Sequence, residues 1–307
     1  MMASVQHRYV QHSKQRRLNS GIEIPTIRQW IRRIARPVCA IGLLGISIAA
    51  APEPVAAKAP APAADALKLT VSAAASLRDA LTEITSAFKR SHSGVDVALN
   101  FGASGTLELQ IERGAPVDVF ISASAEEMNA LSTRKLLVET TRVDLLQNEL
   151  VLIVPRASTA PAAPASFRDL ARPDVRLVAL GDPRSVPAGH YAQQVLTALG
   201  IYDAVKPKVV FASDVRQVLA DVETGSADAG LVYVTDARIS ARVRVVAEAP
   251  PGTHEPIEYP AAVLAAAQSA PAHAAASLAY VEFLKTPVAR AIFTKYGFRP
   301  AEKSAAH

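Results

Sequence analysis

The sequence predicts an α/β fold in which mostly parallel sheets are flanked by helices. From Leu67 onward, short apolar runs rich in valine alternate with segments of helical period, and this alternation is typical of βαβ units. Hydrophobic residues make up 50% of the 307 residues, so the chain is able to bury a substantial core. Its length fits one large domain or two smaller ones.

The alternation places the individual elements along the chain. A Pro/Ala/Ser turn region is expected at 157–164, and no internal repeat is visible. Helices are expected to begin near Ser76, Ser104, Ala125, Pro187, Ser213 and Ala274. Strands are expected at 67–73, 95–101, 117–122, 150–155, 175–180, 208–211, 229–234 and 257–264.

The positive charge of the chain lies in its N-terminal segment. The formal net charge is +5, but residues 1–65 hold 9 Lys and Arg against 3 Asp and Glu, which leaves −1 for the rest. A body without an overall basic field argues against a nucleic-acid partner.

The same segment has the layout of a secretory signal peptide. An Arg-rich stretch ends at Arg36, and an apolar run from Val38 to Ala50 is followed by small residues. That run is shorter than the roughly 20 residues that span a membrane. We therefore expect a signal peptide at 1–57, a Pro/Ala tail at 58–66 and a soluble, periplasmic mature protein, with an uncleaved anchor as the alternative. The single cysteine, Cys39, lies inside the leader, so no disulfide, thiolate nucleophile or cysteine metal site is expected in the mature chain.

Two early helix starts have features suited to holding a small anion. A helix N-terminus offers unpaired N–H groups and the positive end of a dipole. Ser76 follows a strand and precedes Asp79 by three residues, the spacing of a capping box. Ser104 lies within Gly102-Ala103-Ser104-Gly105, where the glycines let a bound group approach the backbone closely.

Two later helix starts and one strand end share this character. Pro187 suits a first helical position, and the small Ala188 after it leaves backbone N–H groups accessible. Ser213 is expected to cap the next helix, which leaves the N–H of Val215 free to point outward. Tyr233 ends an apolar strand, where open α/β sheets place ligand groups. A plain cap, a plain turn or a packed aromatic ring is the alternative at each of these positions.

Taken in order, these segments resemble the molybdate-binding periplasmic proteins of ABC importers, over nearly the whole chain from Leu67 to Pro300. The most specific match is the stretch from Asp182 to Ala192. The other matching segments are Ala74-Ala75-Ser76-Leu77, Ser104-Gly105-Thr106-Leu107, Ser213-Asp214-Val215-Arg216, Gly230-Leu231-Val232-Tyr233 and Ile292-Phe293 to Tyr296-Gly297-Phe298.

The resemblance implies a type II periplasmic-binding-protein fold, with two α/β lobes that close over the anion. The first lobe would comprise 67–145 and 248–303, and the second 146–247. Two crossovers would join the lobes, near 145–149 and near 235–247.

The resemblance also implies a binding site and a ligand. The family's site falls on Ser76, Ser104, Ala188, Val215 and Tyr233, which would offer hydroxyl, backbone N–H and phenol donors and no charged group. A fully ionised dianion needs donors only, whereas phosphate also needs an acceptor for its hydrogen. We expect molybdate or tungstate as the ligand, delivered by a monomer to the membrane permease of an ABC transporter. No catalysis, cofactor, metal-cation ligand or nucleic-acid partner is expected.

Other functions compete with this interpretation. A binding protein for sulfate or another tetrahedral oxyanion would keep the mechanism and change the ligand. A serine hydrolase would use Ser76 or Ser104 as its nucleophile and His190 or another histidine as its base. However, the chain lacks a Gly-x-Ser-x-Gly elbow and a Ser-x-x-Lys with its partner motifs. The widely spaced histidines give little support to a metal site.

Ala103 and Gly105 are small residues where some members of the resembled family carry serine.

Overall fold

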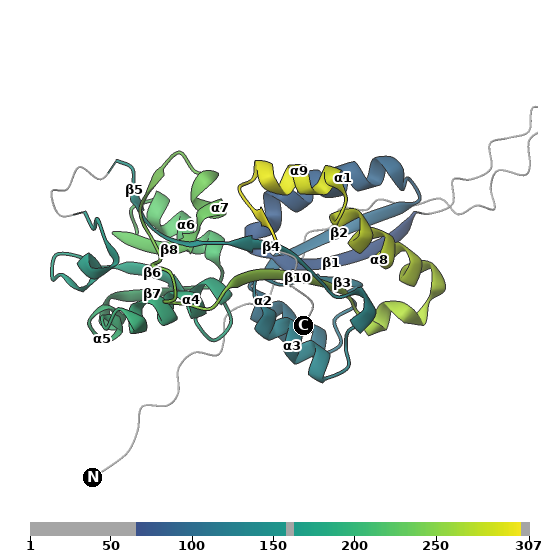
Figure 1. Cartoon of the computed structure of the whole chain (residues 1–307), viewed down its shortest axis with the longest axis horizontal. Coiled ribbons are helices and arrows are strands. Elements are labelled where there is room, and N and C mark those ends of the chain that lie inside the picture. Colours follow the sequence, from purple (N-terminus) through teal and green to yellow (C-terminus); the bar gives the residue numbers. More distant parts are fainter. Residues whose placement is uncertain (1–65, 158–162, 302–307) are drawn as a thin grey trace, which may run out of the picture. The chain divides into compact units, whose positions relative to one another are not determined.

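The computed structural model describes residues 66–157 and 163–301, which form two β-sheets flanked by helices (Figure 1). All of them belong to one unit of the chain, 61–307. The predicted signal peptide, 1–57, and residues 58–65 of the predicted tail lie outside the described residues. The prediction of a two-lobed α/β fold is confirmed, because each sheet forms a lobe with its own helices.

The first lobe is built on a six-stranded mixed sheet. Its strands are β1 (Leu67–Ala74), β2 (Val95–Gly102), β3 (Val119–Ile121), β4 (Val143–Asn148), β10 (Ile257–Val263) and β11 (Arg299–Pro300). Its helices are α1 (Arg78–Ser91), α2 (Ser104–Glu112), α3 (Ala125–Thr133), α8 (Pro271–Leu284) and α9 (Pro287–Lys295). The strand order is β11-β4-β10-β3-β1-β2, with β1 parallel to β2 and β3 and with β10 antiparallel to β3 and β4. Figure 1 shows α1, α8 and α9 on one side of this sheet and α2 and α3 on the other.

The second lobe is built on a five-stranded mixed sheet. Its strands are β5 (Leu150–Pro155), β6 (Val178–Gly181), β7 (Val209–Ala212), β8 (Ala229–Tyr233) and β9 (Val243–Glu248). Its helices are α4 (Pro187–Ala198), α5 (Tyr202–Val205), α6 (Val215–Glu223) and α7 (Val234–Arg238). The order is β7-β6-β8-β5-β9, with β6 parallel to β7 and β8 and with β5 antiparallel to β8 and β9.

Short 3-10 turns complete the described secondary structure. They lie at Ala75–Leu77, Glu139–Thr141, Phe167–Ala171, Lys206–Lys208 and Ala265–Ser269. Within the described ranges, no helix combines the length and the apolar character needed to cross a membrane.

The apolar periodicity of the sequence explains which faces are buried. In α1, Leu81, Ile84 and Phe88 recur at helical spacing and are fully buried. Residues 150–154 of β5 form a continuous apolar run, and all are fully buried, as expected for a strand covered on both faces. β6 and β8 are also buried along their whole length, so the helix starts that follow them are held in fixed places.

The second crossover differs from its prediction. Residues 243–248 form β9, which pairs with β5 in the second sheet, so the chain leaves that sheet only after Glu248 and enters the first at Ile257. The predicted crossover at 235–247 is therefore wrong. β9 was not predicted because its sequence mixes Arg and Glu with valine, and most of its residues are only partly buried.

Several element bounds also differ from their predictions. β4 was not predicted at all, and it lies at the first crossover, where Asn148 is its last residue. α8 begins at Pro271 rather than near Ala274, because proline suits a first helical turn. α9 was not predicted as a helix.

Candidate functional site

A small cavity brings all of the predicted site residues together. Ser76, Ser104, Ala188, Val215 and Tyr233 all line it. It encloses about 210 Å³ of space between atoms. The space therefore suits a compact group rather than an extended ligand. The remaining lining residues are Ala74, Ala75, Gly102, Ala103, Ala123, Val186, Pro187 and Asp214.

If size alone decided which cavity is the binding site, a different hollow in the first lobe would be chosen. A hollow with about 1330 Å³ of space between atoms lies beside Asp118 and His273, and it contains none of the predicted site residues. We favour the small cavity because the starts of α2, α4 and α6 converge on it, and helix starts are sites where anions bind.

Ser76 lies in the 3-10 turn between β1 and α1, and it is not the predicted helix cap. The residue that caps α1 is Leu77, without a side-chain hydrogen bond. The Oγ of Ser76 instead lies 3.0 Å from the Oη of Tyr259, inside the protein. Asp79, the expected partner in a capping box, pairs with Arg216. The capping box is therefore wrong, because the 3-10 turn replaces the first turn of the α-helix.

Ser104 is the first residue of α2 and is buried. Its Oγ accepts a hydrogen bond of 3.0 Å from the N–H of Ala123, in the segment that follows β3. The hydroxyl proton of Ser104 is consequently left to donate elsewhere, and the cavity is the space that the residue lines.

Ala188 lies in the first turn of α4, which begins at Pro187 as predicted. The N–H groups of a first helical turn have no acceptor within the helix. The next residue, Gly189, packs directly on β6, since a Cβ atom placed there would lie 2.1 Å from the carbonyl oxygen of Gly181. This close approach presses the start of α4 against the end of the strand.

Val215 is the first residue of α6, and the cap of this helix is Asp214 rather than the predicted Ser213. The Oδ1 of Asp214 accepts from the N–H groups of Arg216 at 2.8 Å and Gln217 at 3.1 Å. Aspartate and serine are equally good caps, so the sequence did not distinguish the two neighbours. The N–H of Val215 is not one of the two that the cap engages.

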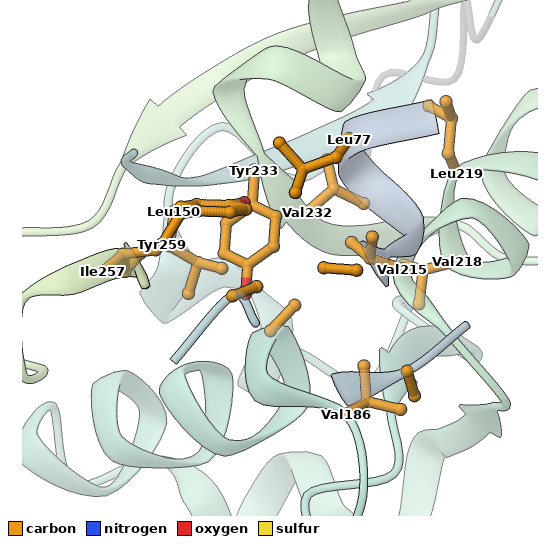
Figure 2. Close-up of a cluster of buried hydrophobic side chains, with 14 of the residues drawn as sticks. Leu77, Leu150, Val186, Val215, Val218, Leu219, Val232, Tyr233, Ile257 and Tyr259 are labelled. Atoms are coloured by element: carbon orange, nitrogen blue, oxygen red, sulfur yellow. The ribbon is translucent and has the colours of Figure 1, made fainter. Parts of the chain in front are cut away.

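Tyr233 is the last residue of β8 and is fully buried. Among the described residues its Oη has no hydrogen-bond partner, although a buried hydroxyl almost always has one. Burial, followed by the neighbouring phenol of Tyr259, raises the pKa of Tyr233 well above its usual range. The phenol therefore stays protonated and is able to donate. Figure 2 shows the rings of Tyr233 and Tyr259 beside one another, with centroids 6.0 Å apart.

A buried polar network that the sequence did not reveal orients Ser76. The Nδ2 of Asn148 donates to the Oη of Tyr259 at 3.1 Å and to the Oγ1 of Thr235 at 2.9 Å. Its Oδ1 accepts from the N–H of Glu149, which fixes the orientation of the amide. Because an amide nitrogen only donates, Tyr259 is free to donate its own proton to Ser76. In that arrangement the proton of Ser76 is directed away from Tyr259.

Arg216 is a second feature that the sequence did not reveal. Its Nε lies 2.7 Å from the Oδ1 of the fully buried Asp236, in an ion pair whose geometry does not meet the angles of a hydrogen bond. Its Nη2 lies 2.7 Å from the Oδ2 of Asp79 and donates to the carbonyl oxygen of Ser76 at 3.1 Å. Burial raises the pKa of Asp236 to about 6, although Arg216 acts in the opposite direction.

The electrostatics of the cavity follow from these contacts. Among the described residues that line it there is no Lys, Arg or His, and Asp214 is the charged one. The positive potential comes from the starts of the helices and, one layer further out, from Arg216. No group of three or more His, Cys, Asp or Glu side chains placed to hold a metal ion occurs among the described residues.

The serine-hydrolase alternative finds no histidine among the described residues that line the cavity. The Nε2 of His190 lies 3.0 Å from the Nε2 of Gln194, and His190 is not among the lining residues. The two serine hydroxyls make hydrogen bonds with the phenol of Tyr259 and the amide of Ala123, neither of which takes a proton at neutral pH.

Comparison with known proteins places the chain in a defined family. The profile of the family described as bacterial extracellular solute-binding protein matches residues 69–299. The molybdate-binding protein ModA of Escherichia coli is 41% identical over 239 residues, which are 76% of this chain and 90% of that protein. YvgL of Bacillus subtilis, provisionally described as an ABC transporter substrate-binding lipoprotein, is 41% identical over 230 residues, which are 75% of this chain and 85% of that protein.

A solved structure agrees with the sequence comparison. The periplasmic molybdate-binding protein of Azotobacter vinelandii superposes with a TM-score of 0.66 at 26% identity. The match covers 76% of this chain and 100% of that chain.

Proposed function

This chain belongs to the bacterial extracellular solute-binding protein family, and on that premise we propose that it captures molybdate, and equally tungstate, in the cavity between its two lobes. It delivers the anion to the membrane permease of an ABC transporter. It acts outside the cytoplasmic membrane, as a monomer and without a cofactor. We propose a lobe division close to the predicted ranges, 67–145 with 248–303 and 146–247.

The observation that carries the proposal is the buried, protonated hydroxyl of Tyr233, which has no hydrogen-bond partner among the described residues. An isolated buried hydroxyl costs free energy, and a bound oxyanion would satisfy it. Ser76 and Ser104 line the same cavity, and each has a neighbour that leaves its proton available. Together with the N–H groups at Ala188 and Val215, they form a set of neutral donors.

This donor set suits a fully ionised tetrahedral dianion. Phosphate at neutral pH carries a proton and needs an acceptor. The carboxylate of Asp214 also lines the cavity, but its Oδ1 already accepts two backbone N–H groups. We favour molybdate over sulfate because the 41% identical relative in Escherichia coli is a molybdate-binding protein. Binding without turnover is part of the proposal, and the family match supports it.

Thermal unfolding of the purified protein tests the proposal. Molybdate, tungstate, sulfate and phosphate are added separately at about 100 times the dissociation constant measured for molybdate. A ligand that binds only the folded state should add about 2.7 kcal/mol of stability under these conditions. Stabilisation by molybdate and tungstate alone supports the proposal. Stabilisation by sulfate instead would change the ligand, and no response to any of the four anions would overturn the oxyanion site.

A further inference from the structure

The two lobes contact each other directly at two places next to residues of the cavity. At the first, the N–H of Gly105 at the start of α2 donates to the carbonyl oxygen of Ser185, in the loop before α4, at 3.0 Å. At the second, Arg216 of α6 pairs with Asp79 of α1 and donates to the carbonyl oxygen of Ser76. Gly105 follows the site residue Ser104, and Arg216 follows the site residue Val215.

We propose that Gly105 and Arg216 are positioning residues that form a two-point clasp, and that this clasp sets the anion affinity by stabilising the closed arrangement of the lobes without touching the anion. The inference rests on the proposed function. If only the closed arrangement binds, the apparent dissociation constant equals the intrinsic one divided by the closed fraction. Any change that weakens the clasp therefore weakens binding, even when every donor to the anion is intact.

At Gly105 the clasp leaves no room for a side chain. A Cβ atom there would lie 2.9 Å from the carbonyl oxygen and 3.0 Å from the Cα of Ser185. Both atoms belong to the backbone of the other lobe, so no rotamer change relieves the contact. Gly105 does not have a positive φ angle, and alanine is the better helix former, so the first lobe alone tolerates alanine at this position.

At Arg216 the roles of the two carboxylates differ. Asp236 lies on α7 of the same lobe, is fully buried and holds the guanidinium in place. Asp79 lies on the other lobe, with a side chain that is 40% exposed, whereas the side chain of Arg216 is only 18% exposed. Removal of the Asp79 charge therefore weakens the contact between lobes and leaves the pair inside the second lobe intact.

The chain offers a matched control for each half of the clasp. Gly94 has open space around its Cβ position and no positive φ, so Gly94→Ala repeats the chemical change of Gly105→Ala without a collision. Asp96 pairs with Lys89 in an exposed ion pair within the first lobe. Asp96→Asn thus repeats the charge change of Asp79→Asn away from the lobe contact.

The test measures molybdate affinity by titration calorimetry, and anion-free melting temperature, for the purified wild type and these four variants. Gly105→Ala should weaken binding at least tenfold and Asp79→Asn about three- to tenfold. Both controls should stay within about twofold of wild type. Without the anion, Gly105→Ala and Gly94→Ala should each melt at or above the temperature of wild type. If Gly105 had only a structural role, Gly105→Ala would melt at a lower temperature. The weaker binding of Gly105→Ala and Asp79→Asn should appear as a faster dissociation of molybdate.

The outcomes separate the clasp from the function. If wild type binds molybdate and either Gly105→Ala or Asp79→Asn binds as tightly as its control, the clasp is overturned and the proposed function stands. If wild type binds none of molybdate, tungstate, sulfate and phosphate, both are overturned.

Discussion

The two lobes line the same cavity with different kinds of group, and the donors that we propose differ accordingly. In the first lobe they are the side-chain hydroxyls of Ser76 and Ser104, each of which has a hydrogen bond to a neighbour. In the second lobe they are backbone N–H groups at the starts of α4 and α6, and the phenol of Tyr233. This difference determines which substitutions affect the donors of each lobe. Substitution removes a donor of the first lobe directly, whereas the backbone donors of the second lobe change only when the backbone itself moves.

The largest expected effect comes from the backbone of the second lobe. In Gly189→Ala the new methyl group would meet the carbonyl oxygen of Gly181 at 2.1 Å, so α4 must move away from β6. We expect a loss of about 3 kcal/mol or more in unfolding free energy, measured by urea denaturation, together with loss of molybdate binding. Gly94→Ala, in open space, is the control. Wild-type stability of Gly189→Ala would contradict the close packing of α4.

A first-lobe donor is removed without moving the backbone in Ser76→Ala. Hydrogen bonds to charged groups contribute about 1.5–3 kcal/mol, so molybdate affinity should fall about tenfold to a hundredfold. Tyr259→Phe keeps the hydroxyl of Ser76 and removes only the group that orients it. Calorimetry should therefore show a smaller loss for Tyr259→Phe than for Ser76→Ala, and the reverse order would contradict the assigned roles.

The cap of α6 gives an intermediate effect. Asp214→Ala leaves the N–H groups of Arg216 and Gln217 without their acceptor, and loss of an N-cap costs about 1 kcal/mol. Ser213→Ala is the matched control, because the structure places the cap at Asp214. Thermal unfolding should show a lower melting temperature for Asp214→Ala alone. A larger decrease in melting temperature for Ser213→Ala would show that Ser213 is the N-cap, as predicted from the sequence.

The last expected effect is a pH dependence from Asp236, confined to the acidic range. Its pKa in the folded protein is about 6, above the ordinary 3.8, because burial disfavours the charged form. The folded state thus binds the proton more tightly than the unfolded state, and the contribution of Asp236 to stability falls as the pH rises from about 4 to about 6. The difference in unfolding free energy between wild type and Asp236→Asn should decrease over this range and level off above pH 7. A difference that grows with pH would show that the pKa is lowered instead.

The sequence predicted the features whose signals are local. A strand followed by small residues and a helix start marks Ser76, Ser104 and Val215 within a few residues of chain. Proline at a first helical position located the start of α4 at Pro187. The strands that are buried on both faces were predicted within a few residues, because their continuous apolar runs are also local signals.

The features that were missed depend on residues far apart in the chain. Ser76 contacts Tyr259 across 183 positions and Arg216 across 140. No periodicity or local motif carries such a pairing, so Asn148, Tyr259 and Arg216 were not predicted as parts of the site. The wrong cap at Ser213 has a different origin, since Asp214 beside it is as good a cap.

The most direct test of the donor-only site is Tyr233→Phe, with molybdate affinity and anion-free stability measured on the same protein. The variant removes a buried hydroxyl that has no partner among the described residues. We expect the anion-free stability to stay constant or rise, and the molybdate affinity to fall about tenfold to a hundredfold. Unchanged affinity, or a loss of affinity explained by a loss of stability, would contradict the assignment of this phenol as a donor to the anion.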